Sequence, residues 1–234
     1  MTPPGRASDL AGFPRPSLAV DVAVATVLPD QRLGVLVHRR SGDRAGLWAL
    51  PGRFLRERER LAHAVATTLA EKCGISRRAL AGRVPRQLHL FDDPSRDDRG
   101  WVLSAAHLLA LPYDYLAPLL AQRADIAVAP VVDDRLRTPG RQRALPYGQD
   151  EIVARALTEL RREYAEEPDP EALLGSAPFT LSELHAVHCA VLDTDWQIDT
   201  FRRRMLPMLV HTGEVTTGGP GRPAAQYVRA HAHD

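Results

Sequence analysis

The chain has 234 residues, of which 44% are hydrophobic and 25% are charged, and its formal net charge at pH 7 is +1. This composition is that of a globular protein with one large domain or two smaller ones. A charge so near zero excludes gross affinity for nucleic acid or membranes, so any DNA binding must come from a local patch. No apolar run reaches the roughly 18 residues of a membrane-spanning helix, and we expect a cytoplasmic protein without a membrane partner.

The first half of the chain predicts a mixed sheet flanked by helices. Residues 1–16 lack the apolar core of a signal peptide and are expected to form a disordered lead. Residues 18–28 and 32–40 are apolar and β-branched, which predicts two strands. A helix is expected at about 59–73, where apolar residues recur at i+4 spacing. Further strands are expected at 84–91, 101–111 and 125–132.

Residues 52–75, GRFLRERERLAHAVATTLAEKCGI, resemble a Nudix box. In that family, glutamates at positions i, i+3 and i+4 of a helix lie on one face and hold divalent metal ions against a pyrophosphate. Aligned on the closing Gly-Ile pair, these positions here are Thr68, Glu71 and Lys72. Thr67 stands where the family has arginine. The trio therefore has no net charge, and its lysine would repel a dication.

These substitutions predict a protein that is not a metal-dependent enzyme, with no catalytic and no metal-binding residue at this site. One alternative is a working ADP-ribose pyrophosphatase that holds Mg²⁺ with Glu57, Glu59 and Glu71. The plainer interpretation of Glu57 and Glu59 is that they are solvated charges, which are favourable near the N-terminus of the following helix.

Two segments near the box supply residues suited to a nucleotide. Arg39 and the later GLWALPGRF (46–54) resemble the segment that leads into the box in Nudix proteins. The loop LFDDPSRDDRGW (90–101) combines arginines, which suit phosphate oxygens, with aromatic rings that could stack on a base. The alternative is a solvated hairpin loop whose arginines pair with the neighbouring aspartates. The expected ligand-binding residues are Arg39, Trp48, Arg53, Phe54, Phe91, Arg96, Arg99 and Trp101.

Residues 148–234 predict a different module, which begins with a linker helix at about 148–165. A second helix is expected at about 181–192, because Thr180 followed by Glu183 forms a capping box. The apolar stripe of the linker helix is expected to contain Ile152, Ala156, Leu160 and Tyr164.

A third helix, from Thr200 to about Val210, and two strands joined by a Gly/Pro-rich wing complete the order of a winged helix-turn-helix. The third helix would enter the major groove. Two observations count against DNA binding. From residue 171 onward there are five Arg against seven Asp or Glu, and Pro207 lies inside the proposed helix. The alternative is a solvated arginine face. The expected DNA-binding residues are Thr180, Thr200, Arg202, Arg203, Arg204 and Arg222.

The order and spacing of four segments together resemble the NrtR family, the Nudix-related transcriptional regulators of NAD metabolism. They are GLWALPG, DPSRDDRGW, PFTLSELHAVH and DTFRRRML with its following TGE and GRPAAQYV. The segment LPYGQD (145–150) also occupies the place of a short motif in these regulators. The resemblance implies a homodimer that binds a palindromic operator in double-stranded DNA. It also implies that ADP-ribose, or a related nucleotide, acts as an effector that releases the DNA, with no cofactor.

The expected fold is α+β. Residues 17–147 would form a Nudix-like α/β/α sandwich that binds the effector, and 148–234 the linker helix and the winged helix-turn-helix. The expected function is a ligand-responsive regulator, a repressor of genes for NAD biosynthesis or salvage. Besides the pyrophosphatase, an alternative is a protein-interaction adaptor whose winged helix never meets DNA.

Overall fold

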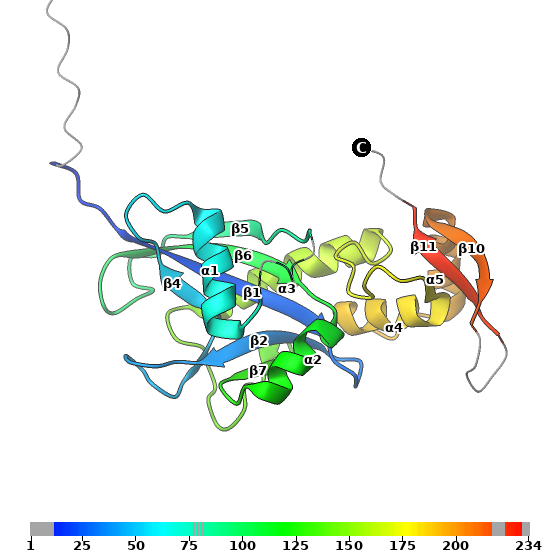
Figure 1. Cartoon of the computed structure of the whole chain (residues 1–234), viewed down its shortest axis with the longest axis horizontal. Helices are drawn as coiled ribbons and strands as arrows, with labels where there is room; N and C mark the ends of the chain where they lie inside the picture. Colours follow the sequence, from blue (N-terminus) through cyan, green and yellow to red (C-terminus); the bar gives the residue numbers. More distant parts are fainter. Residues whose placement is uncertain (1–11, 77, 79, 81, 217–222, 231–234) are drawn as a thin grey trace, which may run out of the picture.

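The structure is a computed structural model that describes residues 12–76, 78, 80, 82–216 and 223–230. A large sheet with helices on both faces occupies one end of the molecule, and a small sheet with two helices occupies the other (Figure 1). The elements are β1 (Ser17–Val27), β2 (Leu33–Arg39), β3 (Trp48–Ala49), β4 (Gly52–Phe54), α1 (Leu61–Cys73), β5 (Arg86–Phe91), β6 (Val102–Ala110), α2 (Tyr113–Gln122), β7 (Ile126–Val132), β8 (Arg135–Leu136), α3 (Gln149–Glu166), β9 (Phe179–Thr180), α4 (Leu181–Leu192), α5 (Ile198–Met205), the 3₁₀ turn η2 (Leu206–Met208), β10 (Leu209–Val215) and β11 (Ala225–Arg229).

The large sheet is mixed, as the sequence predicted. Its strand order is β5-β6-β1-β2-β7-β8, with β3 paired to β2 and β4 paired to β1. Strands β1 and β6 run parallel from the pair Ser17–Val102 to the pair Ala25–Ala110, and the other pairs are antiparallel. All the long strands expected from the apolar segments are present.

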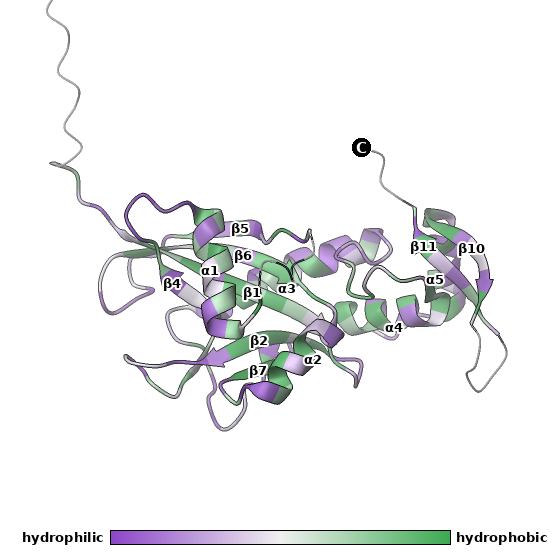
Figure 2. Ribbon diagram, viewed as in Figure 1, coloured by the Kyte–Doolittle hydropathy of each residue, from purple (hydrophilic) through white to green (hydrophobic). Residues whose placement is uncertain are grey.

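Alternate residues of β1 enter two separate cores, because successive side chains of a strand point to opposite faces. Val20, Val22 and Val24 pack with α1 and α2 on one face. Ala23 and Ala25 pack with α3 on the other face. The apolar residues of β1 and β2 are coloured green in Figure 2. This is the expected α/β/α sandwich, but its second helical layer is α3, which the sequence analysis assigned as a linker helix to the C-terminal module.

The C-terminal elements form a winged helix. The small sheet has the order β10-β11-β9. The predicted capping box is present at the start of α4: the backbone N–H of Glu183 donates to Thr180 Oγ1 at 3.2 Å, and the N–H of Thr180 donates to Glu183 Oε2 at 2.7 Å. The core of this module is formed by Phe179, Leu184, Phe201 and Met205.

The proposed recognition helix is shorter than expected. Helix α5 ends at Met205, η2 follows, and β10 begins at Leu209, so Val210 belongs to a strand. Pro207 lies within η2, and because proline cannot donate the helical hydrogen bond it ends the helix here. Helix α2, which contains Pro118, was not predicted.

Some expectations fall outside the part of the chain that the structure describes. Residues 1–11 of the expected lead and the wing residues 217–222, with Arg222, are among them. Within the described ranges, no helix combines the length and the apolar character needed to cross a membrane.

Two buried histidines lead us to expect a loss of stability in mild acid. Burial lowers the pKa of His38 and of His188 to about 4, whereas a histidine in the unfolded chain has a pKa near 6.5. Between these values the unfolded state binds more protons, so the free energy of unfolding falls as the pH is lowered. Each histidine should contribute a loss of about 1.5 kcal/mol between pH 6.5 and 5.

Urea unfolding at pH 7 and at pH 5 measures this effect. Burial raises the pKa of Asp21, and its contribution has the opposite sign, so the histidine effect is isolated by comparing variants. We expect the pH dependence of His188→Gln to be weaker than that of the wild type. Equal pH dependence in the two proteins would contradict the assignment.

Candidate functional site

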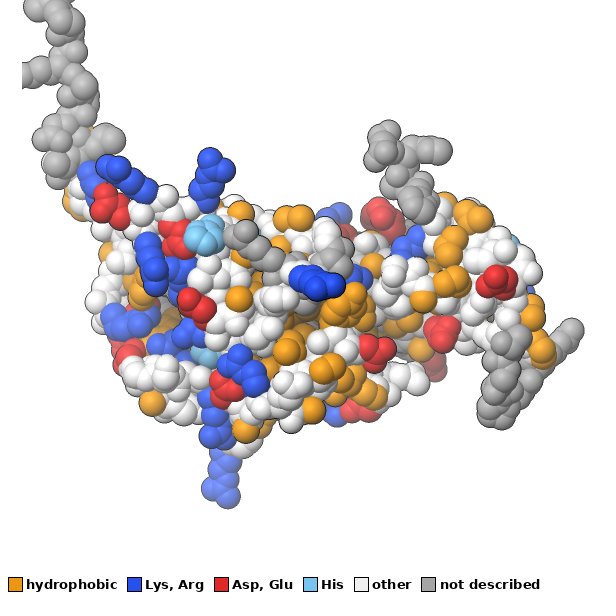
Figure 3. Space-filling view, viewed as in Figure 1, with side chains coloured by type: hydrophobic (Ala, Val, Ile, Leu, Met, Phe, Trp, Pro, Cys, Tyr) orange, Lys and Arg blue, Asp and Glu red, His pale blue; other side chains and the backbone are white. Residues whose placement is uncertain are grey.

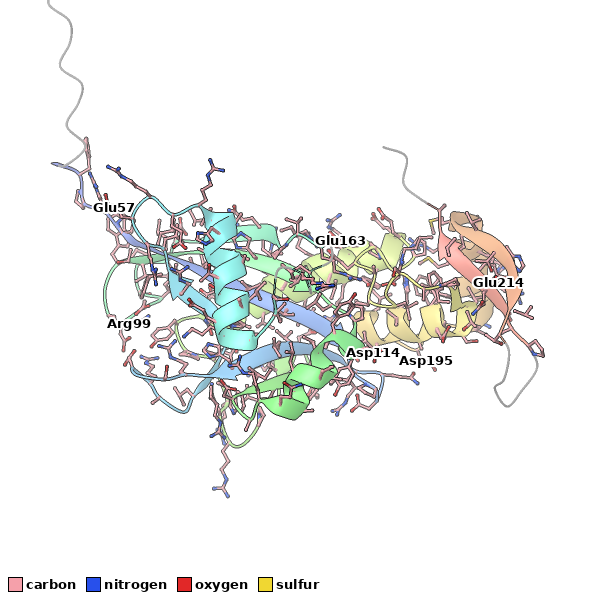
Figure 4. All side chains as sticks on the ribbon, in the orientation of Figure 1. Glu57, Arg99, Asp114, Glu163, Asp195 and Glu214 are labelled. Carbon is pink, nitrogen blue, oxygen red and sulfur yellow. The ribbon has the colours of Figure 1, made fainter. Side chains whose placement is uncertain are left out.

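A cavity of about 240 Å³ opens between β1, β4, the loop before β6 and the start of α3. Figure 3 shows Lys and Arg side chains gathered around this end of the molecule, and Figure 4 labels Arg99 there. The cationic side chains of the lining are Arg40, Arg53, Lys72, Arg96 and Arg99, and the acidic ones are Asp21 and Asp97. With five cations and two acids, the cavity is suited to an anionic ligand.

Asp21 forms the floor of this cavity. It lies opposite Gly52 in the pairing of β1 with β4. A Cβ atom at Gly52 would lie 2.2 Å from Asp21 Oδ1, so only glycine fits at this position. Asp21 Oδ2 accepts a hydrogen bond from Ser104 Oγ at 2.5 Å. Burial raises the pKa of the Asp21 carboxyl, and the Ser104 hydrogen bond and the Arg96 charge oppose this.

The start of α3 forms one wall. Gln149 Nε2 donates to Asp21 Oδ1 at 2.6 Å, and the same amide accepts from the backbone N–H of Leu50 at 2.8 Å. The chain reaches this position through two residues in the left-handed region, Tyr147 at φ 60° and Gly148 at φ 65°. These contacts fix the first turn of α3 against the floor of the cavity.

The ring of Tyr147 supports a group of guanidinium ions. The guanidinium carbons of Arg40, Arg44 and Arg99 lie 4.7, 4.7 and 4.1 Å from its ring centroid. The Tyr147 hydroxyl donates to Asp43 Oδ2 at 2.5 Å. A guanidinium stacked on an aromatic ring is held in place, and its planar fork of N–H donors suits phosphate and carboxylate oxygens.

Arg96 and Arg99 are held in place by the protein. Arg96 Nη2 donates to the carbonyl of Tyr147 at 3.0 Å, and it lies 3.8 Å from Asp21 Oδ2. The guanidinium of Arg99 makes two hydrogen bonds to the Asp97 carboxylate, at 2.8 and 2.6 Å, and this pairing lowers the pKa of Asp97. The sequence left open that the loop arginines pair with the loop aspartates and bind no ligand. Arg99 does pair with Asp97, and it also lines the cavity.

On the face of α1 that holds metal ions in a Nudix box, the side chains of this chain make other contacts. The Thr68 hydroxyl donates to the carbonyl of Ala64 at 2.7 Å, and Lys72 lines the cavity. Glu59 Oε1 pairs with Arg53 Nη1 at 2.7 Å, and this pairing contributes to lowering the pKa of Glu59, after the hydrogen bond from the Arg56 backbone. Among the described residues, no group of three or more His, Cys, Asp or Glu is placed to hold a metal ion.

The structure brings half of the expected ligand-binding residues to the cavity, namely Arg53, Phe54, Arg96 and Arg99. The others lie elsewhere. Trp48 is buried and Arg39 packs over its ring at 5.1 Å. Phe91 packs against the core beside α3, and Trp101 is 48% exposed.

Several lining residues were not anticipated from the sequence: Asp21, His38, Arg40, Tyr147 and Gln149. A signal existed for Tyr147 and Gln149, because both belong to the segment LPYGQD, which occupies the place of a family motif. Asp21 gave no local signal, since its neighbours in β1 are apolar and its partner Gln149 is distant in sequence.

The second candidate site is the exposed side of α5. Thr200, Arg202, Arg203 and Arg204 are exposed, whereas Phe201 and Met205 are buried. Arg203 Nε donates to the carbonyl of Asp199 at 3.3 Å, and Arg204 lies 5.7 Å from the Trp196 ring. Thr180, also expected at DNA, is 8% exposed and its hydroxyl belongs to the capping box.

Comparisons with known proteins agree with both halves. Residues 172–228 match the family model of the NrtR DNA-binding winged helix domain. The chain is 24% identical over 219 residues to the ADPR responsive transcriptional repressor NtrR of Acinetobacter baylyi, a match that covers 92% of this chain and 82% of that protein. The Nudix domain of Shewanella oneidensis NrtR complexed with ADP ribose matches 65% of this chain and 93% of its own, with 29% identity and a TM-score of 0.50.

The crystal structure of Shewanella oneidensis NrtR complexed with a 27mer DNA has a TM-score of 0.72 and 31% sequence identity. The match covers 91% of this chain and 93% of that one. On this identity and coverage, the chain belongs to the NrtR family.

Proposed function

We propose that this chain is an ADP-ribose-responsive transcriptional repressor of genes for NAD biosynthesis or salvage. In this proposal residues 17–147, together with Gln149 at the start of α3, bind the effector, and the winged helix within 148–234 carries DNA binding, in the cytoplasm. The observation that carries the proposal is the cavity, with five cations around it at the place where a Nudix hydrolase would hold metal. The Shewanella and Acinetobacter relatives support ADP-ribose as the effector.

The nucleotide is bound without being cleaved. Metal-assisted attack on a pyrophosphate needs carboxylates that hold Mg²⁺. Here Thr68 bonds its own helix and Glu59 pairs with Arg53, while Lys72 supplies a positive charge at the cavity. The side chain of Glu57 is 89% exposed. These placements favour electrostatic capture of the pyrophosphate over hydrolysis, and they disfavour the pyrophosphatase alternative.

Operator binding is assigned to α5 in a homodimer. Two copies related by a twofold axis would place their α5 helices in successive major grooves of a palindrome, with half-sites about one helical turn apart or a multiple of it. Arg202, Arg203 and Arg204 would contact phosphates and guanine edges, and Thr200 would lie beside them.

The test uses duplexes selected from a random-sequence pool by the full-length chain. Fluorescence anisotropy should show that saturating ADP-ribose weakens binding by about 10-fold or more, within the usual range of allosteric coupling. AMP and ribose 5-phosphate serve as comparison ligands, and AMP release from ADP-ribose in Mg²⁺ is followed in parallel. If ADP-ribose leaves the DNA affinity unchanged, the chain is not an ADP-ribose sensor. If AMP is released at ordinary enzymatic rates, the chain is a pyrophosphatase.

Arg99→Ala should raise the ADP-ribose concentration needed for release by about 10- to 100-fold, because a charge-assisted hydrogen bond contributes about 1.5–3 kcal/mol. The matched control is Arg155→Ala, which removes an exposed arginine of α3 outside the cavity. Titration calorimetry measures the affinity directly. Equal affinities in the two variants would remove Arg99 from the effector site.

A further inference from the structure

The carboxylate of Asp169 is fully buried in the loop between α3 and the winged helix. Its Oδ1 accepts hydrogen bonds from the Tyr164 hydroxyl at 2.5 Å and from the N–H of Leu173 at 2.7 Å. Its Oδ2 accepts from the N–H of Leu174 at 3.0 Å and from the guanidinium of Arg229. These donors fix the carboxylate, because a buried charge is retained only when it is paired and hydrogen-bonded.

Asp169 connects three elements, α3, α4 and β11. Tyr164 lies on α3 and Arg229 lies on β11. The N–H of Asp169 donates to Nε2 of His188 on α4 at 3.1 Å, and its carbonyl accepts from Arg229 Nε at 2.9 Å. Asp169 has a φ of 49°, in the left-handed region that few non-glycine residues adopt. The loop is therefore held in one shape, and it ties the end of α3 to the winged helix.

The other end of α3 forms the wall of the effector cavity. Gln149, its first residue, hydrogen-bonds Asp21, and Tyr147 precedes it. From Gln149 to Tyr164 the helix extends about 22 Å at a rise of 1.5 Å per residue. Buried residues of this helix, among them Leu160, keep it packed on the sheet. Figure 4 labels Glu163, beside Tyr164, between the cavity end marked by Arg99 and the wing end marked by Glu214.

We propose that the contact of Tyr164 with Asp169 is a positioning contact through which the effector cavity controls the placement of the winged helix. The inference rests on the proposed function. A ligand that moves Tyr147 or Gln149 shifts α3 as a unit. The contacts of Asp169 with Tyr164, His188 and Arg229, here called the Asp169 joint, pass the shift to α4 and β11. Packed helices move between discrete arrangements, and a ligand changes DNA affinity only through contacts that differ between them.

Tyr164 does not line the cavity, and its side chain is fully buried, whereas the arginines of α5 are exposed. Its role can therefore be separated from binding at either site. The variant Tyr164→Phe keeps the ring, which packs 5.1 Å from the His188 ring centroid, and removes the hydroxyl. In the full-length chain we expect its affinity for ADP-ribose and for the selected operator duplex to stay within about threefold of the wild type. The coupling, which is the factor by which ADP-ribose weakens DNA binding, should fall from the usual range of about 5- to 150-fold toward one.

The second variant, Arg229→Lys, keeps the cation and removes the fork that binds both the carbonyl and the carboxylate of Asp169. Its coupling should also fall toward one. The control, Tyr115→Phe, removes a hydroxyl from an exposed tyrosine of α2 and should couple as the wild type does. Thermal unfolding checks that each variant is folded.

The outcomes separate the inference from the proposed function. If the wild type couples and both joint variants couple equally well, the joint plays no part in transmission, and the effector function stands. If the variants bind DNA more weakly even without effector, Asp169 has only a structural role and the inference is wrong. If ADP-ribose does not change the DNA affinity of the wild type, the proposed function is wrong. The inference about the Asp169 joint then falls with it.

Discussion

Replacing Arg202, Arg203 and Arg204 together by alanine should weaken operator binding by about 100-fold or more, since each arginine that touches DNA contributes roughly 1–3 kcal/mol. All three side chains are exposed on α5, and the buried Phe201 and Met205 keep the helix in place without them. The slope of log affinity against log salt should fall by about one unit for each phosphate that the variant no longer neutralises. Anisotropy titrations over a range of salt concentrations measure both quantities.

The matched control removes the same charge elsewhere. Arg56, Arg58 and Arg60 are exposed residues of the loop before α1, and their triple alanine variant removes three positive charges far from α5. It should bind the operator nearly as the wild type does. If both triple variants bind equally weakly, then general charge and not the α5 surface determines binding. If neither variant binds more weakly than the wild type, α5 does not contact DNA. That result would favour the alternative in which the winged helix binds another protein.

Asp169→Ala should lower the free energy of unfolding by about 3–5 kcal/mol, which is the usual effect of removing one partner of a buried ion pair. The substitution leaves the guanidinium of Arg229, the Tyr164 hydroxyl and the N–H groups of Leu173 and Leu174 without their acceptor. Such groups destabilise the folded state when they stay buried and unpaired. Urea unfolding, followed by tryptophan fluorescence, measures the decrease.

Asp169→Asn retains the size and one acceptor oxygen, so its effect should be smaller, about 1–3 kcal/mol. Asp195→Ala is the control, because Asp195 is exposed in the turn between α4 and α5 and should change stability by less than about 0.5 kcal/mol. An effect of Asp169→Ala as small as that of Asp195→Ala would mean that the joint contributes nothing to stability.

Local signals in the sequence were sufficient for most of the fold. The strands were predicted because their apolar residues are continuous, and the start of α4 at Leu181 was predicted because Thr180 and Glu183 form its capping box. The early end of α5 has its cause in Pro207. Helix α2 was missed, since its start at Pro112 has no side-chain cap and Pro118 lies inside it.

The site was predicted only where it is contiguous in sequence. Arg96 and Arg99 come from one loop and Arg53 and Phe54 from the short strand β4, so motif spacing was enough to select them. Asp21 and Gln149 are 128 residues apart and meet through the packing of α3 on the sheet. The spacing of apolar residues along the sequence does not show that these two residues are in contact. The cavity floor therefore required the tertiary structure.

The ion pair between Arg53 and Glu59 also determines what it would take to build a metal site into this chain. If the proposed function holds, such a variant would need Glu59 free of its guanidinium and acids in place of Thr68 and Lys72. Replacing Lys72 would at the same time remove a cation from the lining of the cavity. A gain in affinity for Mg²⁺ would therefore come with a loss of affinity for anions.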